Sequence, residues 1–230
     1  MTEDRAAQLA AIATEIGTCT ACRLHENATN PVPGYGDPAA EILFIGEAPG
    51  FNEDKQGLPF VGRSGKYLDY LLELIDLKRE QVFITNVVKH RPPENRDPQS
   101  DEIIACKDFL LRQFAIIDPL VVATLGRFSM QQYFPDGRIS RIHGQPKYAD
   151  GRAYYPLYHP AAALRNPTLR HDMEADIRRI PEVLAEVKRR REQGGVPIDA
   201  PQMDIIGDMP DQDDNDDDSD GGGPVQLKLF

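Results

Sequence analysis

Residues 46–65 read GEAPGFNEDKQGLPFVGRSG, between an apolar run at 42–45 and a periodic segment at 67–75. The apolar run has the length and β-branched content of a buried strand, and the periodic segment predicts a helix. The stretch between them is therefore predicted to be a long loop from a strand to a helix.

The composition of this loop indicates a ligand site. Its five glycines and two prolines allow the backbone to approach a ligand closely. Glu47, Glu53 and Asp54 supply carboxylates, and Phe60 supplies a stacking face. A glycine-rich connector with solvated acids is the alternative, and the phosphate-loop pattern G-x-x-x-x-G-K-[ST] is absent.

Strands and helices alternate along the rest of the chain. Apolar runs predict further strands at 81–88, 120–125 and 152–157, and periodic segments predict helices at 3–16, 101–114, 127–133 and 172–191. This order predicts an α/β fold: a single-domain, three-layer α/β/α arrangement around a central, mostly parallel four-stranded sheet. In such sheets ligands bind beyond the carboxyl ends of the strands, where the polar motifs of this chain lie.

The negative charge of the chain is concentrated in its tail. From Asp199 onward there are ten Asp and one Lys, so 27 of the 37 acidic and 25 of the 26 basic residues belong to 1–198. We expect a folded domain at 1–198 and an acidic linker at 199–225, and the nearly neutral domain is compatible with nucleic acid. No signal pattern or membrane-spanning apolar run is present, so a cytoplasmic, nucleoid-associated protein is expected.

Three cysteines point to a metal or a cluster. Cys19 and Cys22 form a C-x-x-C, Cys106 lies on a predicted helix, and His90, at a strand end, is the candidate fourth ligand. A Cys3His set suits zinc better than an iron-sulfur cluster, but the spacing leaves the metal open. A redox pair or small core residues are the alternatives for the C-x-x-C.

Five segments occur together in the order of a known family: GEAPGFNEDKQGLPFVGRSG, ITNVVKHRPPENRDP, EIIAC followed by KDFL, VVATLGRF and YHPAAALRNP. Across about residues 15–185 the chain resembles the family 4 uracil-DNA glycosylases, bacterial and archaeal enzymes that carry a [4Fe-4S] cluster. The resemblance implies the fold of those enzymes and a monofunctional DNA N-glycosylase that opens base excision repair. It also implies a structural [4Fe-4S] cluster bound by Cys19, Cys22, His90 and Cys106, with zinc as the alternative. His90 is a departure, because most of the family has cysteine there.

The resemblance also assigns roles to residues at the strand ends. Phe60 stacks on the flipped uracil. The Asn86 amide reads uracil N3–H and O4, which cytosine cannot match. His159 donates to uracil O2 as the glycosidic bond breaks.

Other residues surround this reading site. Glu53 positions or activates water, as a carboxylate does in glycoside hydrolysis. Glu47 and the Ala48 backbone line the same site. Leu164 is expected to enter the DNA stack, and Arg165 to contact phosphate.

Some assignments leave alternatives open. Arg63, Lys89 and Arg91 are further candidates for phosphate contacts, with solvated charge as the alternative. A related branch traps uracil-DNA covalently through the histidine of a KRRIH insertion after its VKH motif. Only RPPENRDPQSDEIIA separates His90 from Cys106, and the similar RISRIH ends at His143, after the third strand. We therefore predict a hydrolase, with a covalent or non-catalytic uracil-DNA binder, or a zinc protein that binds nucleic acid, as alternatives.

The terminal segment 226–230 reads QLKLF and resembles the bacterial sliding-clamp-binding pentapeptide, with Gln226, Leu229 and Phe230 as anchors. An apolar peptide at the end of an acidic tether makes physical sense as a docking segment. A solubilising tail is the alternative. We expect a monomer whose partners are uracil-containing DNA and a sliding clamp.

Overall fold

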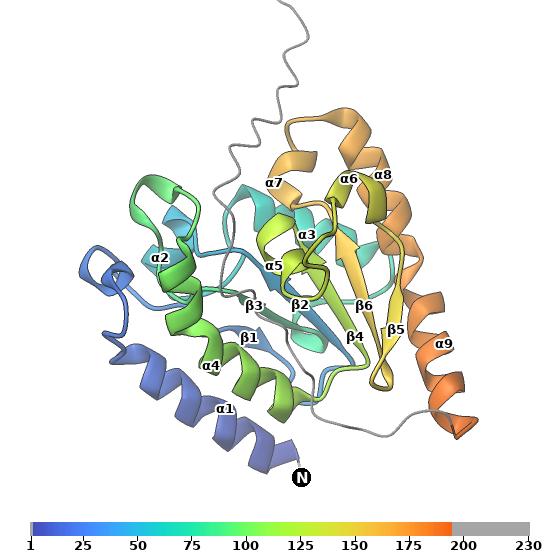
Figure 1. Cartoon of the computed structure of the whole chain (residues 1–230), viewed down its shortest axis with the longest axis horizontal. Coiled ribbons are helices and arrows are strands. Elements are labelled where there is room, and N and C mark those ends of the chain that lie inside the picture. The colour runs from blue at the N-terminus through green and yellow to red at the C-terminus, as the bar shows by residue number, and fades with distance from the viewer. Residues whose placement is uncertain (1, 195–230) are drawn as a thin grey trace, which may run out of the picture.

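The computed structural model describes residues 2–194 of the chain and has a central six-stranded sheet with helices on both faces (Figure 1). The strand order is β1-β3-β2-β4-β6-β5. In chain order the strands are β1 (Tyr35–Gly36), β2 (Ile42–Gly46), β3 (Phe83–Asn86), β4 (Val121–Leu125), β5 (Lys147–Ala149) and β6 (Arg152–Leu157).

The four central strands pair in parallel, which confirms the α/β class and the mostly parallel sheet. The predicted number of four strands was too low, because β1 and β5 add antiparallel pairs at the two edges. These strands have two and three residues, and neither is fully buried. They therefore lack the apolar run that identifies a central strand.

Helices cover both faces of the sheet in the described part of the chain. They are α1 (Thr2–Gly17), η1 (Arg23–Glu26), α2 (Phe51–Gln56), α3 (Arg63–Glu73), η2 (Arg79–Gln81), η3 (Pro93–Asn95), α4 (Ser100–Ile117), α5 (Arg127–Gln131), α6 (Ile139–Ile142), α7 (Pro160–Ala163), α8 (Pro167–Arg178) and α9 (Ile180–Glu192). Figure 1 shows α1 and α4 side by side on one face, and α8 and α9 follow each other along the other. The three-layer prediction is confirmed.

Two hydrophobic clusters fill the spaces between the layers. In β2, Ile42 and Phe44 join the cluster that contains α3, α8 and α9, whereas Leu43 and Ile45 join the cluster that contains α1, α4 and α5. Successive side chains of a strand point to opposite faces. Burial on both faces explains why the central strands appear in the sequence as continuous apolar runs.

Two helical boundaries differ from the sequence prediction. The segment 46–65 contains α2, which begins after Gly50 and ends at Gly57 with φ +69°. Six residues are too few to show helical periodicity. The helix predicted at 172–191 is two helices, and Pro181 lies in the first turn of the second, where its missing N–H costs little.

No helix in residues 2–194 is long and apolar enough to cross a membrane. The boundary of the predicted domain at residue 198, the linker at 199–225 and the terminal peptide at 226–230 lie outside the described residues.

Candidate active site and cysteine corner

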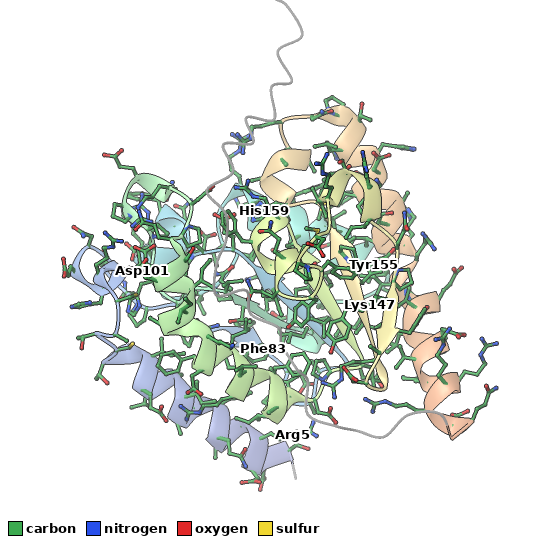
Figure 2. The ribbon with its side chains drawn as sticks, viewed as in Figure 1. Arg5, Phe83, Asp101, Lys147, Tyr155 and His159 are labelled. Carbon is green, nitrogen blue, oxygen red and sulfur yellow. The ribbon has the colours of Figure 1, made fainter. Side chains whose placement is uncertain are left out.

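The carboxyl ends of the parallel strands bring the predicted site residues to one edge of the sheet. Gly46 and Asn86 are register partners at the ends of β2 and β3. At the ends of β4 and β6, Gly126 donates its N–H to the Leu157 carbonyl at 2.9 Å. Figure 2 shows His159, two residues beyond Leu157, at this same edge. The predicted convergence of the motifs is therefore confirmed for the strand ends.

The side chains of Asn86 and Phe60 both lie close to the backbone of Gly46. Asn86 is 1% exposed, and its Oδ1 has no hydrogen-bond partner among the described residues. A Cβ atom on Gly46 would lie 2.4 Å from Asn86 Oδ1 and 2.6 Å from the Phe60 ring. A buried amide oxygen without a partner is costly, so this oxygen is available for a ligand donor.

Phe60 is held in an uncommon backbone conformation. Its φ of +52° lies in the left-handed region. The Arg79 guanidinium donates to the Phe60 carbonyl at 2.7 Å and to Asp69 at 2.8 Å. A Cβ atom on Gly65 would lie 1.8 Å from the same carbonyl oxygen, so only glycine fits there. Arg79 and Gly65 therefore fix the orientation of the aromatic ring.

Glu53 lies on the inner face of α2 and is nearly buried. Its Oε1 accepts the N–H groups of Val61 at 2.9 Å and Gly62 at 2.8 Å. Its Oε2 accepts no hydrogen bond within residues 2–194, and a Cβ atom on Gly50 would lie 2.8 Å from it. One carboxylate oxygen is thus anchored, and the other remains available.

His159 lies beside Phe60, with the two ring centroids 5.9 Å apart. Its Nδ1 accepts the Ala161 N–H at 3.1 Å. Burial lowers the pKa of His159 to about 4, the nearby Arg165 lowers it further, and the Glu53 carboxylate opposes both. The ring is therefore neutral at pH 7 with its proton on Nε2, which makes that nitrogen a hydrogen-bond donor.

Glu47 and Ala48 continue the backbone from β2. Burial raises the pKa of Glu47 to about 7, the Asp97 carboxylate raises it further, and Arg127 opposes both effects. Glu47 is thus partly protonated at neutral pH. The Ala48 side chain packs against the cluster beneath α1 and α4, so its backbone is the part that can face a ligand.

The segment predicted to enter DNA follows His159. Leu164 ends α7 and packs partly against the cluster beneath α3, α8 and α9. Arg165 is exposed, and its Nε donates to the Ala161 carbonyl at 3.2 Å. The structure therefore places an apolar and a basic side chain beside the site.

We call the region formed by Cys19, Cys22 and Cys106 the cysteine corner. Burial raises the pKa of the Cys106 thiol, the charge of Lys89 and its N–H bond at 3.4 Å oppose this, and Cys22 and Cys19 raise it again. The three thiols are therefore close enough to affect one another. A backbone N–H directed at sulfur is the kind of contact that tunes cluster-bound thiolates.

His90 is nearly buried, but its titratable neighbours differ from those of the cysteines. Burial lowers the pKa of His90, His25 lowers it further, and Asp54 raises it. The His25 Nδ1 lies 2.7 Å from the Cys22 carbonyl oxygen. Within residues 2–194 no three His, Cys, Asp or Glu side chains are close enough to hold a single metal ion. His25 is a second imidazole beside the corner that the sequence reasoning did not single out.

Lys89 and Glu102 are two further buried charges that the sequence reasoning missed or misplaced. Lys89 is fully buried, so the suggestion that it contacts DNA phosphate is wrong. Glu102 accepts two hydrogen bonds from Arg96, at 2.6 and 2.8 Å, and one from the Gln99 N–H at 2.8 Å. The spacing of Gln99 and Glu102 resembles a capping box, so the hydrogen bond between the Gln99 N–H and Glu102 could have been predicted from the sequence.

Comparison with known proteins decides the family. Residues 33–183 match the family model described as the uracil DNA glycosylase superfamily. The chain belongs to the uracil-DNA glycosylase superfamily. It is 49% identical over 185 residues to the type-4 uracil-DNA glycosylase of Sulfurisphaera tokodaii, covering 76% of this chain and 84% of that protein. The corresponding enzyme of Saccharolobus solfataricus is 47% identical over 186 residues, covering 76% and 85%.

These relatives place the chain in the type-4 branch of the uracil-DNA glycosylases, as the motifs indicated. The type-5 uracil-DNA glycosylase of Thermus thermophilus is 34% identical over 116 residues and covers only 44% of this chain. The superfamily model spans Gly46, Asn86 and His159, whereas Cys19 and Cys22 precede it. The strand-end site therefore lies within the matched range, and the C-x-x-C lies outside it.

Proposed function

We propose that this chain hydrolyses the N-glycosidic bond of deoxyuridine in DNA, releasing uracil and leaving an abasic site, and so opens base excision repair. The observation that carries the proposal is the buried, unpartnered Asn86 Oδ1, which lies against Phe60 at the edge where His159 also lies. This arrangement supplies a stacking face, a reading group and a donor for one flipped base.

Selection of uracil follows from the Asn86 amide. Its Oδ1 accepts from uracil N3–H while its Nδ2 donates to O4. Cytosine presents an acceptor at N3 and a donor at the exocyclic position, so both contacts would be mismatched. Because Oδ1 is already removed from water, a mismatched base leaves it unsatisfied, which costs about 1–3 kcal/mol.

Bond cleavage uses His159 and Glu53. As the C1′–N1 bond breaks, its electron pair moves into the uracil ring, and His159 Nε2–H donates to O2, where negative charge accumulates. Removing such a donor costs about 3 kcal/mol. The free Oε2 of Glu53 orients a water molecule toward C1′ and stabilises the cationic sugar, and the proton of the water leaves through the carboxylate.

Contacts with the rest of the DNA are proposed for two neighbouring residues. Leu164 enters the base stack at the position of the flipped nucleotide, and the exposed Arg165 contacts phosphate. Glu47 and the Ala48 backbone line the uracil site.

For the cysteine corner we propose a [4Fe-4S] cluster held by Cys19, Cys22, His90 and Cys106, with zinc as the alternative. The mutual influence of the three thiols on their pKa values and the N–H bond to Cys106 support a shared ligand group. When bound, the group would cross-link the segment after α1 to the part of the chain after β3 that carries His90 and Cys106. The catalytic residues lie on other segments and act without it.

A covalent or non-catalytic uracil-DNA binder is the alternative, and the surroundings of His143 bear on it. His143 Nδ1 lies 2.7 Å from Asp176 Oδ2, and its ring packs at an angle of 34° to the Tyr158 ring, with centroids 4.6 Å apart. A histidine packed in this way has a structural role, which supports the hydrolase. The terminal anchors Gln226, Leu229 and Phe230 remain a proposal for docking to a sliding clamp.

The test is uracil release from a labelled single-uracil oligonucleotide in excess over enzyme. We expect more than one equivalent of uracil per chain from the wild type and about 100-fold slower release from His159→Ala. His171→Ala, which removes an exposed histidine of α8, is the matched control and should retain the wild-type rate. A denaturation-stable protein-DNA adduct with no turnover would replace the hydrolase with the covalent binder.

A further inference from the structure

The short helix α2 has two different faces. Glu53 and Asp54 are buried on its inner face. On its outer face, Phe51 and Lys55 are exposed and one helical turn apart. Phe51 is 50% exposed, the largest exposed fraction among the large apolar side chains of the described residues. A single exposed apolar side chain is common on protein surfaces, so the significance of Phe51 depends on the groups around it.

Two cations from different segments lie over this ring. Lys55 Nζ is 4.4 Å and the Arg91 guanidinium is 5.2 Å from the ring centroid. Arg91 follows β3, and its Nε donates to Asn95 Oδ1 at 2.7 Å. Within residues 2–194 neither cation forms an ion pair with a carboxylate. The group therefore combines a stacking face with two positive charges available to a polyanion.

Phe51 and Arg91 are close in the chain to residues of the candidate active site. Phe51 is two residues before Glu53 on the same helix, and Arg91 is five residues after Asn86. A helix with its side chains is about 10 Å across. Successive phosphates of one strand are about 3.4 Å apart along duplex DNA and farther apart in an extended strand, so at most about three nucleotides span the distance between the two faces of α2.

We propose that Phe51, Lys55 and Arg91 form a stacking site for an unpaired base of the substrate strand, within about three nucleotides of the uracil. The base stacks on the half-exposed Phe51 ring, and the two cations contact the phosphates beside it. The inference rests on the proposed function only for its substrate, because stacking requires no cleavage. The stacking site is expected to increase the affinity for single-stranded substrate but not for paired DNA.

The chain contains no tryptophan, so one introduced tryptophan is a unique fluorophore. We would titrate Phe51→Trp, in a His159→Ala background that slows turnover about 100-fold, with a 15-nucleotide single strand carrying one uracil. The control is Ile104→Trp in the same background, because Ile104 is 49% exposed on α4. Stacking quenches the fluorescence at position 51 and leaves that at position 104 unchanged. Equal quenching at both positions, or none at position 51, overturns the proposal.

Oligonucleotides with a base-free sugar at each position within three nucleotides of the uracil then locate the stacked base. One position should abolish the quenching while binding, followed by anisotropy, persists. Quenching that survives at every position would show that no single base occupies the site and would overturn the proposal.

Substitutions in the otherwise wild-type chain test whether the stack contributes to binding. Phe51→Ala should raise the KM for single-stranded substrate roughly tenfold with kcat retained, and Phe51→Tyr should restore the KM because it keeps a stacking face. An unchanged KM in Phe51→Ala overturns the proposal. Quenching at position 51 without uracil release by the wild type would support the stacking site and reject the glycosylase activity. Uracil release without quenching would support the glycosylase activity and reject the stacking site.

Discussion

Lys89 Nζ donates a hydrogen bond of 2.7 Å to the backbone carbonyl of Asn86. The same buried ammonium donates to Thr85 Oγ1 at 2.8 Å and to Gln113 Oε1 at 2.9 Å. The backbone N–H of Lys89 donates to Cys106 Sγ at 3.4 Å. One residue therefore connects the strand end that carries Asn86 with the cysteine corner.

Replacing Lys89 with methionine should destabilise the fold and slow uracil release. The substitution leaves the Asn86 carbonyl and Gln113 Oε1 short of a donor in a buried site, which costs about 1–3 kcal/mol. Urea unfolding measures the loss, and Lys66→Met, at an exposed lysine of α3, is the control that should stay close to wild type. Equal stability of the two variants would show that the three hydrogen bonds of Lys89 make no net contribution to the free energy of unfolding.

Gly46→Ala should slow uracil release about 100-fold while the fold persists. The new Cβ would lie 2.4 Å from Asn86 Oδ1 and 2.6 Å from the Phe60 ring, so both side chains must move. Displacement of about 1 Å in a reacting complex costs about 100-fold in kcat/KM. Gly17→Ala is the control, because a Cβ there meets nothing within 4 Å. Steady-state uracil release should separate the two, and a Gly46→Ala variant of normal activity would mean that Asn86 and Phe60 do not act at this position.

The sequence was sufficient to predict the features of the fold that depend on burial and strand order. The central strands are buried on both faces, so they appear as apolar runs, and their parallel order predicts that Asn86 and His159 share an edge. The edge strands β1 and β5 are short and partly exposed, so nothing in their composition distinguishes them from loop.

Other features depend on tertiary contacts that no local pattern encodes. Lys89 resembled a DNA-contacting cation in the sequence, and only the structure shows that its acceptors come from β3 and α4. The Phe51 site could not be predicted either, because it requires the unpredicted helix α2 and the approach of Arg91 from another strand end. By contrast, the roles of Glu53 and Phe60 followed from the family resemblance and remain proposals.

Glu47→Gln should stabilise the protein at pH 8 but not at pH 4. Burial raises the pKa of Glu47 to about 7, above its value of about 4.3 in the unfolded chain. Between these values the folded state binds the extra proton, so stability falls as pH rises through this window, and the full penalty is present above pH 7. Removing the ionisable group should restore up to about 4 kcal/mol at pH 8.

Urea unfolding of wild type and Glu47→Gln at the two pH values measures this difference. Glu73→Gln, at an exposed acid of α3, is the control that should show no such dependence on pH. A Glu47→Gln variant that is less stable than wild type at pH 8 would mean that the ionised carboxylate forms a favourable contact in the folded state.

Metal analysis of anaerobically purified protein should find about four iron atoms per chain, with matching sulfide, if the cysteine corner holds the proposed cluster. Cys106→Ser removes the buried thiol that accepts the Lys89 N–H, and it should lower the iron content sharply. The imidazole ligand is decided by comparing His90→Ala with His25→Ala, since the His25 ring lies against the Cys22 carbonyl and is also a charged neighbour of His90. Loss of iron in His90→Ala alone supports the proposed set, whereas loss in His25→Ala alone assigns the fourth position to His25.

One zinc ion per chain would replace the cluster with a single-ion site. Removal of the cluster or of the zinc ion should lower the melting temperature, because the bound group cross-links the segment after α1 to α4.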